Sequence, residues 1–378
     1  MYKTYKFRMY PTKSQQILIS KTFGCTRFIY NHFLDKCQKE KYTNAFAMCK
    51  ELKEMYNEYP FLKEVDSCSL RCAIFNLEDA YRDFFDKRSN YPIFKNKYTR
   101  QSYRTNCIRS SYKGKEYANI KLDLKTKEIK LPKLGSVKIR GYRNIKELSE
   151  KIINATITKE TTGKYYVSVV VEELDKKVLK VSPTSIVGID LGIKALVVTS
   201  NGEEYENPKV LSKYEKRIKR LQRKLSRCEK GSKNREKVKL RIARIYSKVK
   251  NARKHTIIEI GNKLVSENDI IVSEKLQVKE MTQNHNLAKP ILDASFTSLC
   301  TYINWKSKCL GKYYYQINPY YPSSKTCNHC GNKSNITNDL SVREWICPSC
   351  GLELKRDINA SINIMYEGLK IHFKEKLS

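Results

Sequence analysis

The sequence lacks an apolar run long enough to cross a membrane. An α-helix needs about 20 mainly apolar residues to span a bilayer, and no uncharged apolar stretch of that length occurs here. The opening segment, MYKTYKFRMYPTK, also lacks the apolar centre of a secretory signal. We therefore expect a cytoplasmic protein without a membrane partner.

Several catalytic signatures are absent as well. No P-loop and no His-Glu-x-x-His motif occurs, so the sequence gives no support for an ATPase or a metalloprotease. A single-strand transposase would need a His-x-His pair for its metal and a nucleophilic tyrosine. No such pair is formed by the five histidines, which are His32, His255, His285, His329 and His372.

Acidic residues are scarce relative to basic ones. The 378 residues include 74 Lys and Arg against 39 Asp and Glu, a formal net charge of +35. A soluble protein with this surplus usually binds a polyanion, so nucleic acid is the leading partner and an anionic membrane surface is the alternative. The length allows two or three domains.

The hydrophobic pattern changes along the chain. A strand-like segment, TYKFRMY, is followed by a capping box at Thr12 and Gln15, and helical spacing then continues to about Phe85. From about Ile120 to Glu173 the period becomes two, which predicts the short strands of a barrel or sandwich. If the N-terminal strand joins that sheet, the helices between them form an insertion.

The second half alternates buried strands with helices. TSIVGIDLGIKALVVTSNGEEY predicts a strand hairpin with Gly192 near its turn, and NDIIVSEKL predicts another short buried strand. A helix is expected near DASFTSLCTYINWKSKCL and a strand at YYYQINP. This order of elements predicts an α/β domain.

Residues 212–254 are the most basic segment, with 19 Lys or Arg and 3 acids. Apolar residues at helical spacing on both sides of EKGSKN predict two helices packed as a hairpin. A charge run is usually only a solvated helix face, but this bias of sign favours contact with phosphates. A second stretch, YPIFKNKYTRQSYR, mixes basic and aromatic residues that could stack on bases or belong to the core. The candidate nucleic-acid contacts are Lys95, Lys97, Tyr103, Arg104, Arg220, Arg223 and Arg227.

Four of the thirteen cysteines form two Cys-x-x-Cys pairs separated by sixteen residues: Cys327, Cys330, Cys347 and Cys350. Two such pairs complete a tetrahedral S₄ site suited to zinc, and the spacing is typical of a zinc ribbon. Gly331 and Gly351 follow the pairs, where tight turns often need positive φ. Four protein ligands leave no open position, so we expect one structural Zn²⁺. The other nine cysteines are interpreted as ordinary thiols of a reducing compartment.

Three acids stand at the ends of predicted elements. Asp190 lies in the apolar strand IVGID, Glu274 ends DIIVSE, and Asp357 begins the helix after the ribbon. Each acid also has a simple structural interpretation. Asp190 could cap a turn near Gly192, and Glu274 could pair with a nearby lysine. Asp357 could be an ordinary acid at a helix N-terminus, where the helix dipole stabilises it. Together they favour a site for two Mg²⁺ ions, as used for in-line attack on phosphodiesters.

These motifs carry a resemblance to a known family. GIDLGIKALVV, IIVSEKL and CNHCG…WICPSCG…RDINASINI resemble the RuvC-type nuclease core of the TnpB family. YKFRMYPTKSQQ, YPIFKNK…QSYRT and YYPSSKTC resemble the family's N-terminus, its middle and the approach to its ribbon, so the likeness covers most of the chain. Ser361 stands where the family usually has alanine.

The resemblance implies an α/β multidomain protein with a RuvC/RNase H-like nuclease core, an inserted zinc ribbon, and a β-barrel wedge domain carrying a helical recognition insertion. Asp190, Glu274 and Asp357 would be the metal-binding catalytic acids. The implied ranges are 1–10 and 120–180 for the wedge domain, 11–119 for the recognition domain, 181–320 and 356–378 for the nuclease domain, and 321–355 for a ribbon that binds target nucleic acid.

The resemblance also implies the function of an RNA-guided DNA endonuclease encoded by a transposon. Its partners would be a guide RNA and double-stranded DNA with a short flanking motif, bound as a monomer or as a dimer on RNA. The cell would be prokaryotic, and the protein would associate with the nucleoid when bound. The alternatives are a catalytically silent RNA-guided regulator and a compact type V CRISPR effector. A purely structural zinc protein does not account for the charge.

Overall fold

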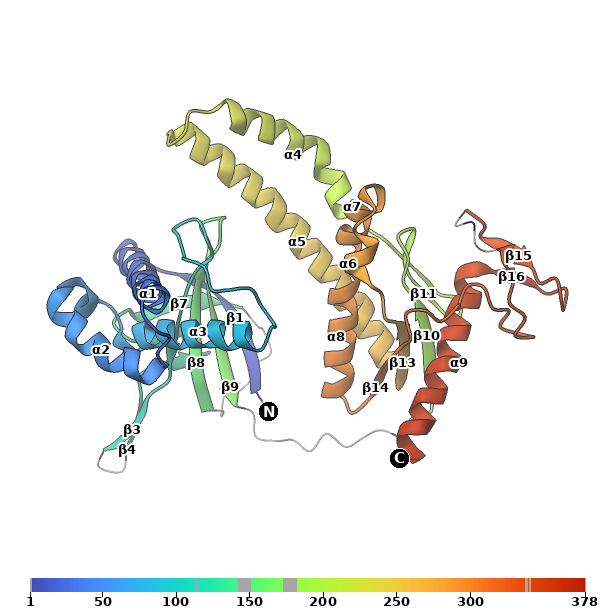
Figure 1. Cartoon of the computed structure of the whole chain (residues 1–378), viewed down its shortest axis with the longest axis horizontal. Coiled ribbons are helices and arrows are strands. Elements are labelled where there is room, and N and C mark those ends of the chain that lie inside the picture. The colour runs from blue at the N-terminus through green and yellow to red at the C-terminus, as the bar shows by residue number, and fades with distance from the viewer. Residues whose placement is uncertain are drawn as a thin grey trace. The chain divides into compact units, whose positions relative to one another are not determined.

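The computed structural model describes residues 2–112, 115–141, 151–172, 182–336, 339 and 341–377. Parts of the expected domain ranges therefore lie outside the described residues. They are 1, 142–150 and 173–180 of the wedge domain, 113–114 of the recognition domain, 337, 338 and 340 of the zinc ribbon, and 181 and 378 of the nuclease domain. The chain divides into two compact units, Met1–Lys176 and Lys177–Ser378, called here the N-terminal and C-terminal units (Figure 1).

The N-terminal unit is built on a seven-stranded antiparallel sheet in the order β2-β8-β9-β1-β7-β6-β5. The predicted N-terminal strand joins this sheet near its centre, where Phe7 pairs with Val167 and Met9 pairs with Ile139. These four side chains are buried in the core of the unit. The strands are β1 (Tyr2–Tyr10), β2 (Gln101–Asn106), β5 (Lys121–Asp123), β6 (Glu128–Leu131), β7 (Gly135–Arg140), β8 (Lys151–Lys159) and β9 (Tyr165–Glu172).

Strand β2 differs from expectation, because it falls inside the range 11–119 that was expected to be helical. It pairs along its whole length with β8, so the sheet begins before residue 120. A separate hairpin of β3 (Arg109–Tyr112) and β4 (Lys115–Ala118) follows it. QSYRTN is short and, apart from Tyr103, polar, so its sequence does not show which positions face inward.

Helices occupy the chain between β1 and β2, as the spacing predicts. They are α1 (Lys13–Lys39), α2 (Ala45–Glu58), the 3₁₀ turn η1 (Pro60–Glu64) and α3 (Ser67–Phe85). The capping box is present: the Thr12 hydroxyl accepts from the Gln15 amide and the Gln15 side chain accepts from the Thr12 amide. The Gln15 side chain also donates to the carbonyls of Leu134 and Ser136, which attaches α1 to the sheet.

The C-terminal unit contains a five-stranded sheet in the order β12-β11-β10-β13-β14. Strands β10, β11 and β12 form an antiparallel meander, and β13 and β14 run parallel to β10. The predicted hairpin and both later strands are therefore confirmed. Their bounds are β10 (Ile186–Asp190), β11 (Ala195–Thr199), β12 (Glu204–Glu206), β13 (Ile270–Glu274) and β14 (Tyr313–Ile317).

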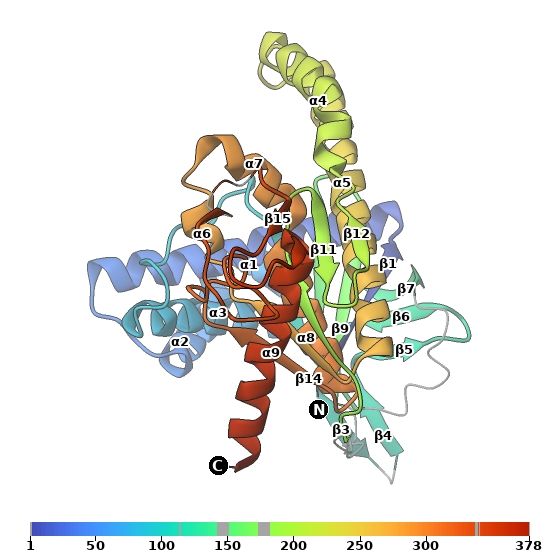
Figure 2. The same ribbon diagram turned by 90° about the vertical axis from the view of Figure 1, so that its right-hand side faces the viewer.

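Helices cover both faces of this sheet (Figure 2). Val187, Ile189 and Ile271 pack in one cluster with residues of α5 (Lys233–Glu267) and α8 (Phe296–Cys309). Ile270 and Val272 point the other way, into a cluster with α9 (Arg356–Leu377). The alternation of a β-strand thus divides the apolar residues between two helical layers. Two shorter helices, α6 (Val278–Met281) and α7 (His285–Ala294), connect β13 to α8.

The first turns of α9 lie directly against β10, at Gly188. A Cβ atom at this position would be 2.0 Å from the Ser361 carbonyl oxygen, so only glycine allows the helix to approach this closely. Strand β10 and helix α9 each carry one of the three candidate acids. The contact at Gly188 therefore fixes the separation of two elements that form the candidate site.

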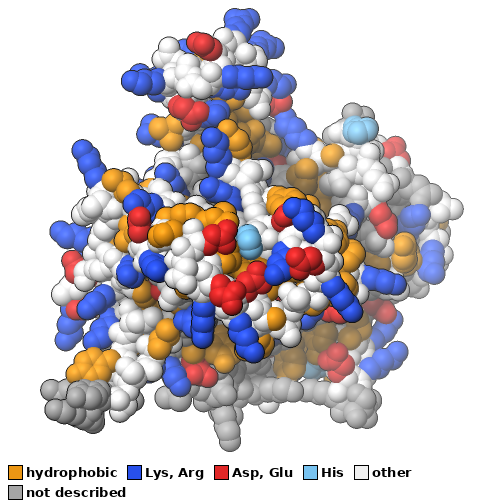
Figure 3. Space-filling model, turned by 60° about the vertical axis from the view of Figure 1, so that its left-hand side comes forward, with side chains coloured by type: hydrophobic (Ala, Val, Ile, Leu, Met, Phe, Trp, Pro, Cys, Tyr) orange, Lys and Arg blue, Asp and Glu red, His pale blue; other side chains and the backbone are white. Residues whose placement is uncertain are grey.

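The basic segment is a helical hairpin, as the sequence predicts. Helix α4 (Val210–Arg227) packs on α5 through apolar residues that include Ile218, Leu221 and Val238. Arg220, Arg223 and Arg227 are exposed on α4. Figure 3 shows Lys and Arg side chains around the projecting end of the hairpin, at the top of the view. Phosphate contact by these arginines stays a prediction.

In the part of the chain that the structure describes, no helix is both long and apolar enough to span a bilayer. The long helix α5 carries basic residues in its first half and packs its second half into the protein core through Ile257, Ile260 and Leu264.

Candidate active site and metal centre

The three predicted acids lie on neighbouring elements of the C-terminal unit. Asp190 is the last residue of β10 and Glu274 is the last residue of β13. These two strands are parallel neighbours, with Ile189 opposite Ser273, so their carboxyl ends meet at one edge of the sheet. Asp357 is in the first turn of α9, which packs against both strands. All three acids line one cavity of about 460 Å³.

The electrostatics of this cavity are those of a crowded anionic site. Burial, together with the negative charges of Glu274 and Asp357, raises the pKa of Asp190 to about 7. Burial also raises the pKa of Glu274, although the Ser323 hydroxyl, which donates to its carboxylate, opposes the shift. A cation between these groups would lower the cost of ionising Asp190, because opposite charge favours the carboxylate form.

A positively charged side chain already contacts one of the acids. Arg343 Nη1 lies 3.1 and 3.0 Å from the two carboxylate oxygens of Asp357. Arg343 comes from the segment between the two Cys pairs, and it lines the cavity together with Lys194 and Arg356. Arg343 could not be predicted from the sequence, because a single arginine in so basic a chain carries no distinguishing signal.

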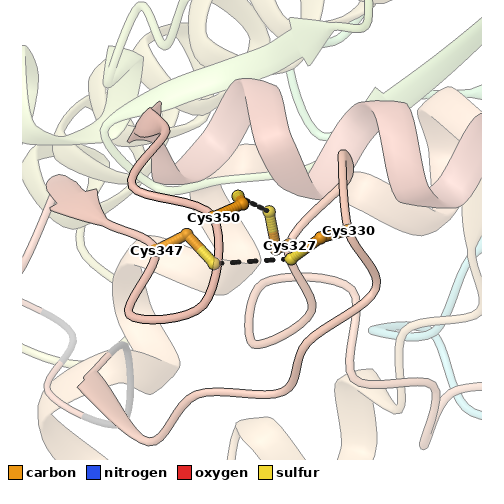
Figure 4. Close-up of side chains that lie close together, drawn as sticks. All are labelled: Cys327, Cys330, Cys347 and Cys350. Atoms are coloured by element: carbon orange, nitrogen blue, oxygen red, sulfur yellow. Dashed lines mark hydrogen bonds between the residues drawn. The ribbon is translucent and has the colours of Figure 1, made fainter.

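The four predicted cysteines converge on one point (Figure 4). Their sulfur atoms all lie within 4.8 Å of one another, and among the described residues this is the only group of three or more such ligands so close together. The acids of the cavity are therefore less tightly grouped than the cysteines. The Sγ atoms of Cys327 and Cys350 are 3.8 Å apart, and those of Cys330 and Cys347 are 3.6 Å apart.

These distances match a zinc site. A Zn–S bond of about 2.3 Å in a regular tetrahedron gives S···S edges of about 3.8 Å. Each knuckle closes with the same turn, in which the glycine amide donates to the carbonyl of the first cysteine, Gly331 to Cys327 and Gly351 to Cys347, at 2.9 Å each. Both glycines have positive φ, 74° and 72°, as predicted. The quartet can hold Zn²⁺ with all four positions filled by protein.

Two asparagines connect this metal centre to the helix that carries Asp357. The Asn359 side chain accepts from the Asn328 amide at 2.9 Å and donates to the Thr326 carbonyl at 2.8 Å. The Asn363 side chain donates to the same carbonyl at 2.7 Å and to the Ser323 carbonyl at 2.8 Å. Both asparagines are buried. They were not predicted from the sequence, although two asparagines four residues apart in the helical pattern RDINASINI are a usable signal.

The candidate contacts of the N-terminal unit have mixed placements. Lys97 is exposed and Arg104 is partly buried. Lys95 directs its ammonium group onto the ring of Tyr30, 3.4 Å from the centroid, and burial lowers the pKa of Lys95 to about 8. Tyr103 is 7% exposed and packs edge-on against Phe23. Because its ring belongs to the core, it is not available to stack on a base. The prediction that Tyr103 contacts nucleic acid is therefore wrong.

Comparisons with known proteins identify the family. A family model described as "Probable transposase" matches residues 168–285. Others, described as "Cas12f1-like, TNB domain" and "Helix-turn-helix domain", match residues 296–364 and 1–45. A Streptomyces pristinaespiralis protein named "Putative RNA-guided DNA endonuclease" is 33% identical over 376 residues, covering 97% of this chain and 89% of the relative. The chain belongs to the TnpB family.

Another relative and a solved structure also match nearly the whole chain. An Escherichia coli protein named "Putative RNA-guided DNA endonuclease InsQ" is 28% identical, and the match covers 97% of this chain and 92% of that protein. The solved structure of the mini-RNA-guided endonuclease CRISPR-Cas_phi3 also matches, with a TM-score of 0.51 and 11% sequence identity. This match covers 98% of this chain and 92% of that chain. At that identity the likeness shows a shared mixed α/β fold. The matched helix-turn-helix region is here one strand followed by the single helix α1.

Proposed function

We propose that this protein is a transposon-associated, RNA-guided DNA endonuclease. The observation that carries the proposal is the single cavity lined by Asp190, Glu274 and Asp357, which come from two parallel strand ends and the first turn of a helix. Three carboxylates from separate elements at one sheet edge are the arrangement of a divalent-metal phosphodiesterase. The printed names of the TnpB relatives support the same activity.

The domain organisation belongs to this proposal. The order β12-β11-β10-β13-β14, with helices on both faces, supports a RuvC/RNase H-like core over residues 181–320 and 356–378. The ribbon, 321–355, would bind target nucleic acid. The seven-stranded sheet would be the wedge domain, and the helices between β1 and β2 would be the recognition insertion.

The three carboxylates fit Mg²⁺, which prefers oxygen ligands. When bound, two such ions would activate the attacking water and stabilise the leaving 3′-oxygen. The chain's own groups prepare the site: Ser323 holds the Glu274 carboxylate, and Arg343 holds that of Asp357. Lys194 and Arg343 supply positive charge to the cavity wall, where they would hold an anionic phosphate.

Specificity would come from base pairing between the guide RNA and one DNA strand, while the protein binds the duplex by shape and contacts a short flanking motif. The net charge of +35 supports the binding of both nucleic-acid backbones.

The test uses the full chain with the RNA that co-purifies when it is expressed from its native locus. Asp190→Asn should abolish Mg²⁺-dependent cleavage of DNA complementary to that RNA and leave RNA binding within about twofold. Glu280→Gln, which removes a charge from the same cavity wall without altering the three acids, is the matched control and should cleave. Full cleavage by Asp190→Asn would overturn the site, and binding without cleavage by the native chain would favour the silent regulator.

A further inference from the structure

A second cavity of the C-terminal unit lies away from the three acids, along the groove between α5 and α8. Helix α8 packs against the second half of α5 (Figure 1). The cavity measures about 840 Å³, at the upper end of the 300–1,000 Å³ usual for pockets that bury small ligands. Its lining is mainly apolar, and it includes Tyr246, Val249, Ile257, Ile258, Tyr302 and Trp305.

The aromatic wall of this α5–α8 groove is held in place by its neighbours. Trp305 is 46% exposed, and its ring packs against Tyr302 with 5.7 Å between centroids. The Tyr302 hydroxyl donates to the Asn262 side chain at 2.9 Å, and its ring lies over Gly261, where a Cβ atom would be 2.5 Å from the ring. Helix α5 therefore fixes Tyr302, and Tyr302 supports Trp305 as a flat, accessible surface.

The charged side chains that line the groove are all basic. Lys250 and Lys254 line it from α5 and are exposed, whereas the third basic residue, Arg253, is engaged by the buried carboxylate of Asp293 at 2.5 Å. No acid is among the described residues that line the groove. An apolar, aromatic floor bordered by two available ammonium groups is complementary to bases that carry phosphates on their outer side.

We infer that the α5–α8 groove binds a single-stranded stretch of the guide RNA, with unpaired bases stacked on Trp305 and Tyr246 and phosphates held by Lys250 and Lys254. A duplex keeps its bases inside, so only an unpaired segment can present them to an apolar groove. The hydroxyl groups of Thr297, Ser298 and Thr301 line the α8 side and offer partners for the ribose 2′-hydroxyl, which distinguishes RNA from DNA.

This inference rests on the proposed function only in taking a guide RNA as the occupant. The experiment therefore measures binding without cleavage. Full-length protein freed of co-purified RNA is titrated with a short fluorescein-labelled oligouridylate, an oligothymidylate of equal length and a blunt RNA duplex, at high salt to weaken phosphate contacts. The wild type should bind the oligouridylate most tightly. Trp305→Ala should weaken that binding at least about 5-fold, the loss expected for one stacked base, and leave the duplex unaffected.

Two further variants keep the result interpretable. Trp305→Phe retains an aromatic ring and should retain most of the affinity, and Tyr366→Ala removes an equally exposed aromatic of α9 outside the groove and should change nothing. A melting temperature close to that of the wild type shows that Trp305→Ala is folded.

Three outcomes would overturn the inference: unchanged oligouridylate affinity in folded Trp305→Ala, equal binding and equal loss with oligothymidylate, or a change of oligomeric state in Trp305→Ala, which would make a second copy the occupant. A protein that cleaves with its guide but binds oligouridylate independently of Trp305 contradicts this inference alone. One that needs Trp305 for binding yet never cleaves contradicts only the proposed function.

Discussion

Arg343 contacts both carboxylate oxygens of Asp357, so an arginine from the ribbon segment is the partner of an acid from the last helix. Both side chains are partly exposed, and exposed ion pairs contribute about 0–1 kcal/mol to stability. The pair is thus better explained by its position in the cavity than by its contribution to folding.

Arg343→Ala should therefore lower the cleavage rate without unfolding the protein. Loss of a positive group that faces developing charge typically costs about 10²-fold in rate, and the melting temperature should change little. Single-turnover cleavage and thermal unfolding measure the two effects. Arg343→Lys, which keeps the charge but not the two-oxygen contact, should recover part of the rate. Undiminished cleavage by Arg343→Ala would show that the contact has no catalytic consequence.

Removal of zinc should disturb the acid site as well as the ribbon. Cys347→Ser leaves three thiolates, so elemental analysis should find substoichiometric zinc and the unfolding temperature should fall, since structural zinc contributes folding free energy. Cleavage should fall too, because Asn359 joins the first knuckle to the helix of Asp357. Cys309→Ser, outside the quartet, is the matched control. A native protein that contains no zinc would contradict the prediction.

Stability should depend on pH through Asp269, at the start of β13. Hydrogen bonds from Thr184, together with Lys312 at 3.3 Å, lower the pKa of Asp269 to about 2. Because this is below the unfolded value of about 3.9, the stabilisation is complete above about pH 5 and is lost progressively as the pH falls through 2. It amounts to about 2–3 kcal/mol.

Urea unfolding of wild type and Asp269→Asn checks this. The difference in free energy of unfolding should be about 2 kcal/mol at pH 6 and should shrink toward zero near pH 2. A difference that stays constant over this range would assign the effect to lost hydrogen bonds instead of ionisation.

The basic hairpin should govern part of the salt dependence of RNA binding. Replacing Arg220, Arg223 and Arg227 by glutamine removes up to three phosphate contacts, and each contact contributes about 0.7–0.9 to the slope of log affinity against log salt. The slope should therefore fall by about 2–3. Replacing Lys219, which pairs with Glu215 on the same helix, is the control. An unaltered slope in the triple variant would show that these arginines face solvent and do not contact phosphates.

Local sequence signals predicted most elements correctly because the physics behind them is local. Thr12 and Gln15 mark a helix start through two hydrogen bonds three residues apart, and the Cys-x-x-Cys-Gly turns define a knuckle within five residues. The three acids were predictable as a group because each ends or begins an apolar element, and parallel strand ends meet at one edge.

Contacts between distant segments could not be read from the sequence. Whether Tyr103 faces the core or solvent depends on the pairing of β2 with β8, more than fifty residues later. The partners of Arg343, Asn359 and Asn363 are equally non-local. The α5–α8 groove is formed by two helices from different parts of the chain. It also needs glycine at position 261, where a Cβ atom would clash with the Tyr302 ring, and a pattern of apolar residues does not reveal this requirement.

The position of Asp357 on the last helix has a consequence for protein synthesis. A ribosome completes β10, the basic hairpin and β13 well before it reaches α9. Glu274 and Asp357 are 83 residues apart in the chain, although they line the same cavity. In the proposed site, a growing chain therefore carries two of the three acids before the ribosome reaches α9, and a chain cut off before α9 lacks the third carboxylate.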